Sequence, residues 1–154
     1  MRIYLAGFDV FRPDSVEQGR KMKELCAQYG FEGCYPLDNE ADTAQEIYEA
    51  NVALLASCDV VAANCNPFRG QEMDSGTAFE VGYGCALGKK VYGYLADGRP
   101  MVEKLGKVDD QGFHVENFGQ PLNLMIAMGA TVVTGGLEEC LQKIQADVAR
   151  NCDL

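Results

Sequence analysis

The stretch that decides the fold is DSGTAFEVGYGCALGKKVYGYL, from Asp74 to Leu95. Its first half has helical composition and ends at Gly88, and its second half, KVYGYL, is a short apolar run typical of a buried strand. One carboxylate, Glu80, stands among the small residues of the helical half. The stretch therefore predicts a helix followed by a strand, with a charged side chain on the helix that needs an explanation.

Strand and helix patterns alternate along the rest of the chain. Asp14 is the expected N-cap of the first helix, and Thr43 with Glu46 predicts a capping box at the start of the second. Strands separated by helices predict an α/β fold in a single domain, residues 1–154. We expect a doubly wound, flavodoxin-like or Rossmann-like parallel sheet of five strands with helices on both faces. The apolar runs that predict its strands are RIYLAGF, FEGCYPL, DVVAAN, KVYGYL and TVVT.

Charge and composition exclude several classes of partner. The formal net charge is -10 and no basic run occurs, so a nucleic-acid polymer is not an expected ligand. No run of about 18 apolar residues predicts a transmembrane helix, and the first residues lack the pattern of a signal peptide. The seven cysteines are odd in number and form no CxxC pair, which favours a reducing, cytoplasmic setting.

Acidic side chains follow three of the expected strands. In parallel α/β sheets, ligands bind beyond the carboxyl ends of the strands. Asp9, Asp38 and Asp74 are therefore expected near one crevice, with Glu80 in the helix that follows and Gly76 leaving room for a ligand. We expect Glu80 about one turn into that helix, where free N–H groups and the helix dipole stabilise an ionised carboxylate. The simpler alternative is that Asp74 is only the cap of this helix and that Glu80 is only a glutamate favoured near the helix start by the dipole.

Other catalytic motifs are absent from the sequence. A lone His114 cannot build a typical catalytic zinc site, and no glycine-rich phosphate motif or GxSxG elbow occurs. The single DSG triplet is followed by a helical pattern, unlike the all-β context of aspartic proteases. What remains is carboxylate chemistry that uses neither a metal nor a cofactor.

Four segments, in order, resemble one known family. DSGTAFEVGYGCALGKKV resembles the catalytic segment of nucleoside 2-deoxyribosyltransferases, with an Asp and a Glu six residues later. IYLAG resembles the family's first strand, with Tyr4 at its tyrosine position, and CDVVAANCNPFRG resembles the strand and loop before the catalytic helix. ENFGQPLNLM resembles the C-terminal segment, whose Asn-Leu-Met lies at Asn123 to Met125.

The resemblance implies an activity and a role for each matched residue. Glu80 would attack C1′ of a 2′-deoxynucleoside and form a covalent deoxyribosyl intermediate, so that 2-deoxyribose passes from one nucleobase to another in nucleoside salvage. Tyr4 would orient Glu80, and Asp74 would hold a sugar hydroxyl. Asn123 and Met125 would complete the site of a neighbouring subunit, which implies a homo-oligomer, a dimer or larger. The partners implied are a small 2′-deoxynucleoside and a free nucleobase, with no membrane and no cofactor.

One position departs from the family pattern. Asn51 stands where the family often has an Asp that protonates the leaving base. Either Asp9 or Asp38 supplies the proton instead, or Asn51 reads the base through hydrogen bonds. Phe8 and Phe68 lie in the crevice loops, where each either stacks on a nucleobase or belongs to the core.

Two other functions compete with base exchange. One is hydrolysis of the N-glycosidic bond of 2′-deoxynucleosides or deoxynucleoside monophosphates, which would use the same fold and nucleophile. The other is a nucleotide-sensing module without catalysis. This alternative is disfavoured because the sequence keeps the catalytic pattern of Asp74, Glu80 and Asn123.

Overall fold

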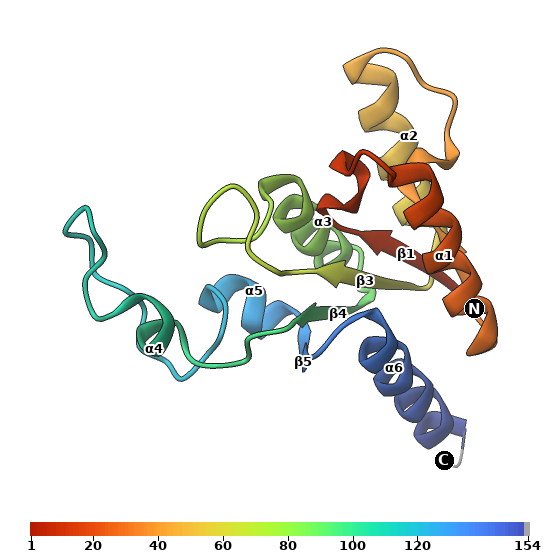
Figure 1. Cartoon of the computed structure of the whole chain (residues 1–154). Coiled ribbons are helices and arrows are strands. Elements are labelled where there is room, and N and C mark those ends of the chain that lie inside the picture. The colour runs from red at the N-terminus through yellow and green to blue at the C-terminus, as the bar shows by residue number, and fades with distance from the viewer. Residues whose placement is uncertain (153–154) are drawn as a thin grey trace.

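The computed structural model describes residues 1–152 and has a parallel sheet at its centre. Its strands are β1 (Arg2–Ala6), β2 (Glu32–Cys34), β3 (Val60–Asn64), β4 (Lys90–Leu95) and β5 (Thr131–Thr134). They pair in the order β2-β1-β3-β4-β5, all in parallel (Figure 1). The predicted five-stranded parallel sheet is confirmed. From β1 the chain continues to β2 at one edge of the sheet, and from β3 it continues through β4 to β5 at the other edge. The direction in which strands are added therefore reverses between β1 and β3.

Helices cover both faces of this sheet. On one face, α1 (Ser15–Gln28) and α6 (Leu137–Cys152) bury Met22, Cys26, Cys140, Leu141 and Ile144. On the other, α2 (Ala44–Ser57), α3 (Ser75–Ala86) and α5 (Leu124–Gly129) bury Leu55, Val81 and Ala127. Short helices follow three strands: η1 (Phe8–Phe11), η2 (Pro36–Asp38) and α4 (Met101–Leu105). Figure 1 shows the segment with α4 extending away from the sheet.

Strand β1 divides its side chains between the two faces. Successive strand residues point to opposite sides of a sheet. Ile3 and Leu5 accordingly join the core under α1 and α6, whereas Tyr4 and Ala6 join the core under α2, α3 and α5. The tyrosine is therefore buried beneath the helix that carries Glu80.

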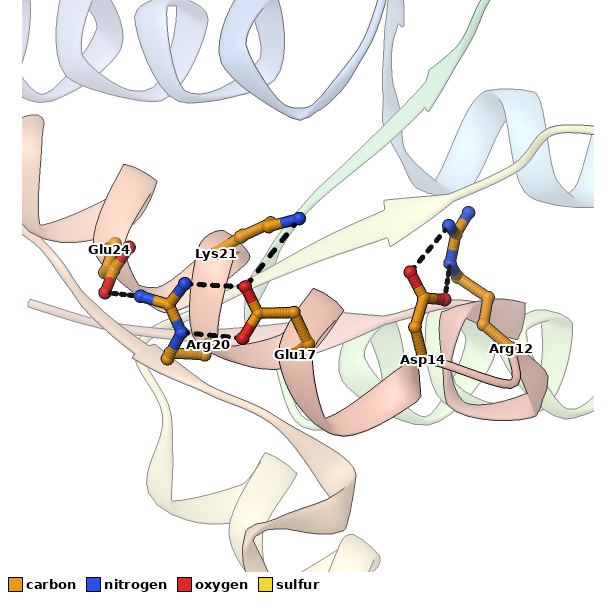
Figure 2. A network of polar contacts seen from close by, with 6 residues as sticks. All are labelled: Arg12, Asp14, Glu17, Arg20, Lys21 and Glu24. Carbon is orange, nitrogen blue, oxygen red and sulfur yellow. Dashed lines mark hydrogen bonds and ion pairs between the residues drawn. The ribbon is translucent and has the colours of Figure 1, made fainter.

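The two predicted helix starts differ in outcome. At α2 the capping box is confirmed, because Thr43 Oγ1 accepts the N–H of Glu46 at 3.3 Å and the Glu46 carboxylate accepts the N–H of Thr43 at 3.0 Å. Asp14 occupies the N-cap position of α1 but makes no side-chain cap. Its carboxylate instead accepts from the Arg12 guanidinium at 2.8 Å (Figure 2), so the predicted N-cap position is confirmed but the side-chain cap is not formed.

Figure 2 also shows the ion pairs along the exposed side of α1. Arg20 pairs with both Glu17 and Glu24, and Lys21 reaches Glu17 at 3.7 Å. These side chains are about half exposed, and such pairs contribute little to stability, about 0–1 kcal/mol each. Among the helices of residues 1–152, none is both long and apolar enough to span a membrane.

Candidate active site

A mostly apolar cavity of about 360 Å³ lies at the carboxyl ends of β1 and β2, beside α2 and the start of α3. Because Asp74, Gly76 and Glu80 follow β3, the cavity also borders the reversal point between β1 and β3, where open α/β folds bind their ligands. The volume falls within the range of small-molecule sites, about 300–1,000 Å³. The cavity is lined by Gly7, Val10, Phe11, Pro36, Leu37, Asn39, Ala41, Ile47, Asn51, Asp74, Gly76 and Glu80.

Glu80 reaches from α3 to the buried side chain of β1. Tyr4 is fully buried, and its hydroxyl donates a hydrogen bond of 2.5 Å to Oε1 of Glu80. Glu80 itself is half-buried and borders the cavity. The strand thus holds one carboxylate oxygen in a fixed place, while the edge of the group stays open to a ligand.

The environment of Glu80 is unusual for a carboxylate. Burial raises its pKa to about 7; the hydrogen bond from Tyr4 opposes this rise and the nearby charge of Asp74 adds to it. Burial, together with the Glu80 charge, also raises the pKa of Tyr4, so the hydroxyl stays protonated and donates its proton to Oε1 of Glu80. A carboxylate that is incompletely ionised near neutral pH, in an apolar cavity, is typical of catalytic groups.

The expectation that the helix start stabilises Glu80 is wrong. No acidic residue lies in the first turn of α3, and the N-terminus is occupied by its N-cap, Asp74. Oδ2 of Asp74 accepts both the N–H of Thr77 at 2.8 Å and its hydroxyl at 2.9 Å. Glu80 lies deeper in the helix, so desolvation dominates its pKa and the N-terminal N–H groups do not reach it.

Two asparagines form an amide pair on the cavity wall. The Asn39 amide nitrogen donates to the Pro36 carbonyl at 3.2 Å and to Oδ1 of Asn51 at 3.3 Å. Both asparagines line the cavity with Glu80. Asn51 is thus on the site as expected, whereas the sequence reasoning missed Asn39, whose place in a turn carries no periodic signal.

Of the three loop aspartates, only Asp74 lines the cavity. Asp9 is buried and accepts from the amide of Asn64 at 2.9 Å, so it ties η1 to β3. Gly7 allows this approach, because a Cβ there would come within 2.8 Å of the Asn64 side chain. Asp38 pairs with Lys23 at 2.6 Å and accepts the N–H of Tyr35, which places it in a structural role.

The crevice aromatics form a stack with a guanidinium beside it. Phe68 stacks on Phe8 with ring centroids 4.9 Å apart and on Phe11 at 5.4 Å, and Arg69 lies 4.7 Å from the Phe68 ring centre. Of the three rings, only Phe11 lines the cavity. Phe8 and Phe68 therefore brace the loop after β3 against η1, and Phe11 forms the wall.

Asn123 and Met125 do not reach the cavity of their own chain. Asn123 is exposed at the N-cap of α5, where Oδ1 accepts the N–H of Met125 at 3.0 Å and the amide donates to Glu116 at 2.6 Å. Met125 is 75% exposed. Within residues 1–152, no group of three or more His, Cys, Asp or Glu side chains is placed to hold a metal ion.

Comparisons with known proteins identify a family that this chain resembles along most of its length. A family model described as nucleoside 2-deoxyribosyltransferase matches residues 3–125. A 2-deoxyribosyltransferase from Leishmania mexicana has a similar structure, with a TM-score of 0.86 and 39% identity over 94% of this chain and 97% of that one.

More distant relatives share the fold. A conserved protein from Enterococcus faecalis has a TM-score of 0.68 at 22% identity over 96% of this chain and 98% of that one. A CMP N-glycosidase from Clostridium botulinum has a TM-score of 0.55 at 17% identity, over 95% and 99% of the two chains.

An uncharacterised protein of Schizosaccharomyces pombe is 38% identical over 113 residues, 67% of this chain. The match spans about half of that curated relative, 54% of its length.

Proposed function

The chain belongs to the nucleoside 2-deoxyribosyltransferase family, a family of enzymes, and we propose that it transfers 2-deoxyribose between nucleobases with Glu80 as the nucleophile. The observation that carries this proposal is the hydrogen bond between Tyr4 and Glu80 at the edge of an apolar cavity. A positioned carboxylate that lacks a cationic partner is suited to attack an electrophilic carbon.

The first step forms one bond and breaks another. With Oε1 of Glu80 held by Tyr4, the second oxygen attacks C1′ of the 2′-deoxynucleoside from the face opposite the base. The C1′–N bond breaks, and its electron pair leaves with the nucleobase, which then takes a proton from water. The transition state resembles an oxocarbenium ion, which the negative charge of Glu80 stabilises.

The second step reverses the first with a different base. A free nucleobase enters the vacated space, and its ring nitrogen attacks C1′ of the deoxyribosyl ester. The C1′–O bond breaks, Glu80 departs as a carboxylate, and the proton of the attacking N–H passes to water. Two inversions give net retention, the same logic as a retaining glycosidase. Asp74 borders the cavity beside Glu80 and has one oxygen, Oδ2, committed to Thr77. Its other oxygen is suited to accept a hydrogen bond from a sugar hydroxyl.

Departure of the base has no obvious carboxylic acid to assist it. Asp9 and Asp38 are outside the cavity lining, and an amide such as Asn51 does not transfer a proton. We expect Asn51 to donate a neutral hydrogen bond to the leaving base, which stabilises negative charge on it without protonating it.

We also propose that the site is completed by a second copy of the chain. Met125 and Met128 of α5 are 75% and 66% exposed, and Tyr48 and Phe79 of α2 and α3 are about half exposed on the same face of the sheet. Exposed apolar side chains gathered on one face are typical of an interface. Asn123 and Met125 would then approach the neighbour's cavity. Light scattering should show a dimer or larger; a monomer at all concentrations would contradict this part.

The experiment for the activity is a base-exchange assay. The protein is incubated with 2′-deoxyinosine and adenine, and the products are separated by chromatography. We expect 2′-deoxyadenosine and hypoxanthine, and no product from Glu80→Gln, with Glu103→Gln as a matched control on an exposed carboxylate. Free deoxyribose without 2′-deoxyadenosine would favour the N-glycoside hydrolase, and no reaction with any base would contradict both. The reducing, cytoplasmic setting stays a prediction, as does the single domain over residues 1–154.

A further inference from the structure

We propose that Thr77 is a positioning residue for the sugar. Its buried hydroxyl fixes the carboxylate of Asp74, so that the other carboxylate oxygen keeps facing a hydroxyl group of the deoxyribose while Glu80 attacks C1′. The inference deepens the proposed function and rests on it, because it assigns a role to a residue that lies behind the same site.

One oxygen of Asp74 takes both hydrogen bonds from Thr77. Oδ2 accepts the backbone N–H of Thr77 at 2.8 Å and its hydroxyl at 2.9 Å. Thr77 is 1% exposed and does not line the cavity, whereas Asp74 is half-buried and does. The threonine therefore reaches the carboxylate from the protein interior and not from the side of a ligand.

Helix capping accounts for only one of these two hydrogen bonds. An N-cap side chain accepts a backbone N–H of the first turn, which any residue except proline supplies at position 77. The second bond needs a side-chain hydroxyl, and a hydroxyl that donates to a carboxylate makes a short, strong hydrogen bond. Because the two donors approach Oδ2 from different directions, they restrict the rotation of the carboxylate more than the N–H alone.

Gly76 leaves room for this arrangement. A Cβ at position 76 would lie 3.2 Å from Oδ2 of Asp74, which is closer than a Cβ normally comes to another atom. A larger residue would therefore press on the oxygen that Thr77 holds. The missing side chain at position 76 and the hydroxyl at position 77 together define one position for the carboxylate.

The second oxygen of Asp74 is left for the ligand. From the described part of the chain, Oδ1 receives no hydrogen bond. Among the same residues, the buried side-chain polar atom without a partner is Oη of Tyr35, so Oδ1 of Asp74 keeps accessible surface. An ionised carboxylate can only accept. Since Asp74 and Glu80 line one cavity and the proposed function places the sugar against Glu80, the donor within reach is a sugar hydroxyl.

Loss of the Thr77 hydroxyl should loosen the sugar without removing a group that touches it. In Thr77→Val the carboxylate of Asp74 still accepts the backbone N–H, but it rotates more freely and Oδ1 faces the sugar for less of the time. Attack requires C1′ to be held close to Glu80 and aligned with it, so kcat/KM should fall by about 10-fold. This loss should depend on the sugar hydroxyl that Asp74 binds, whereas a general defect in packing would not.

The test measures exchange to adenine from 2′-deoxyinosine, 2′,3′-dideoxyinosine and 2′,5′-dideoxyinosine. For each donor, kcat/KM of the wild type is divided by that of Thr77→Val. We expect a ratio of about 10 for 2′-deoxyinosine and of about 1 for at least one dideoxy donor, the one without the hydroxyl that Asp74 binds. The same ratio for all three donors would overturn the inference and leave the proposed function intact. Absence of exchange between 2′-deoxyinosine and adenine in the wild type would instead remove the proposed function.

Further variants separate positioning from a structural defect. Thr77→Ser keeps the hydroxyl and should restore most of kcat/KM for 2′-deoxyinosine, and a serine variant as impaired as the valine variant would contradict the inference. Thr131→Val, the same exchange at an exposed position of β5, is the matched control and should leave all three donors unaffected. If the wild type uses neither dideoxy donor, the recovery in Thr77→Ser decides. If Thr77→Val does not fold, Thr77→Ala takes its place, because it lacks the hydroxyl and puts no methyl group against the carboxylate.

Discussion

Replacing Glu80 with Gln should make the protein more stable at alkaline pH while it removes catalysis. Burial raises the pKa of Glu80 from its ordinary value of 4.5 to about 7, so ionisation inside the fold is unfavourable. Below pH 4.5 the group is protonated in the folded and unfolded chains and has no cost. Between pH 4.5 and about 7 the unfolded chain ionises this group while the folded chain keeps it protonated, so stability falls across that window. Above about 7 the folded protein carries the ionised, half-buried group and the loss is complete.

The size of the effect follows from the change in pKa. Each pKa unit corresponds to about 1.4 kcal/mol, so the full rise would be worth ~3 kcal/mol at pH 8. One edge of Glu80 borders the cavity, where water screens part of this cost, and we expect about 2 kcal/mol. A neutral Gln has no such cost, and its side-chain oxygen can still accept from Tyr4. For a chain of this size, the melting temperature of Glu80→Gln should exceed that of the wild type by about 4–8 °C at pH 8.

The assay is thermal unfolding of both proteins from pH 4 to pH 8. The difference should be close to zero at pH 4 and grow through neutrality, and Glu103→Gln should show no such growth, because that carboxylate is exposed. If Glu80→Gln is no more stable than the wild type at pH 8, or if the difference does not depend on pH, the reasoning about a desolvated carboxylate is wrong.

Two further substitutions should move the pH dependence of exchange in opposite directions. Tyr4→Phe removes the hydrogen bond that lowers the pKa of Glu80, so the acidic limb of the kcat/KM profile should move to higher pH. At neutral pH, kcat/KM should fall by about 10- to 100-fold. An unchanged profile would contradict the role of the Tyr4–Glu80 hydrogen bond. Asp74→Asn keeps a good N-cap but removes the charge that raises the pKa of Glu80, so the same limb should move to lower pH while KM rises. A shift of that limb to higher pH would show that the charge of Asp74 does not act on Glu80.

Local sequence patterns were sufficient for the elements of the fold. The run KVYGYL coincides with β4 (Lys90–Leu95), and TVVT coincides with β5 (Thr131–Thr134). Gly88, with a φ of 69°, ends the helix before β4 because a side chain rarely adopts that conformation. Alternation of such elements, together with the length of the connections, left the doubly wound parallel sheet as the expected arrangement.

The contacts of the candidate site were harder to predict. The pairing of Tyr4 with Glu80 joins residues far apart in sequence, and only the resemblance to a family indicated it. The sequence predicted that the helix start stabilises ionised Glu80, which would lower its pKa, whereas burial raises that pKa. The position of a residue in a helix says little about its desolvation by the sheet beneath. Asp9 was expected at the crevice, yet it turns inward to Asn64 because η1 folds over the end of β3.

Asn39 shows a second reason for incomplete prediction. Its side chain faces the cavity because η2 places the Pro36 carbonyl within reach of its amide. No periodicity marks such a turn residue, and its direction depends on the backbone of one short helix. Asn123 is exposed in the described chain and caps α5, whereas its expected role in a neighbouring subunit's site stays a prediction.

The most direct test of the central claim is to trap the sugar on the enzyme. A 2′-deoxy-2′-fluoro nucleoside slows the second step, because the fluorine destabilises the oxocarbenium-like transition state. After incubation and digestion with trypsin, the fragment Gly70–Lys89 should gain the mass of one fluorodeoxyribosyl group, and fragmentation should place it on Glu80. The Glu80→Gln variant should stay unlabelled. A label on another residue, or the absence of any label while base exchange proceeds, would contradict the covalent role of Glu80.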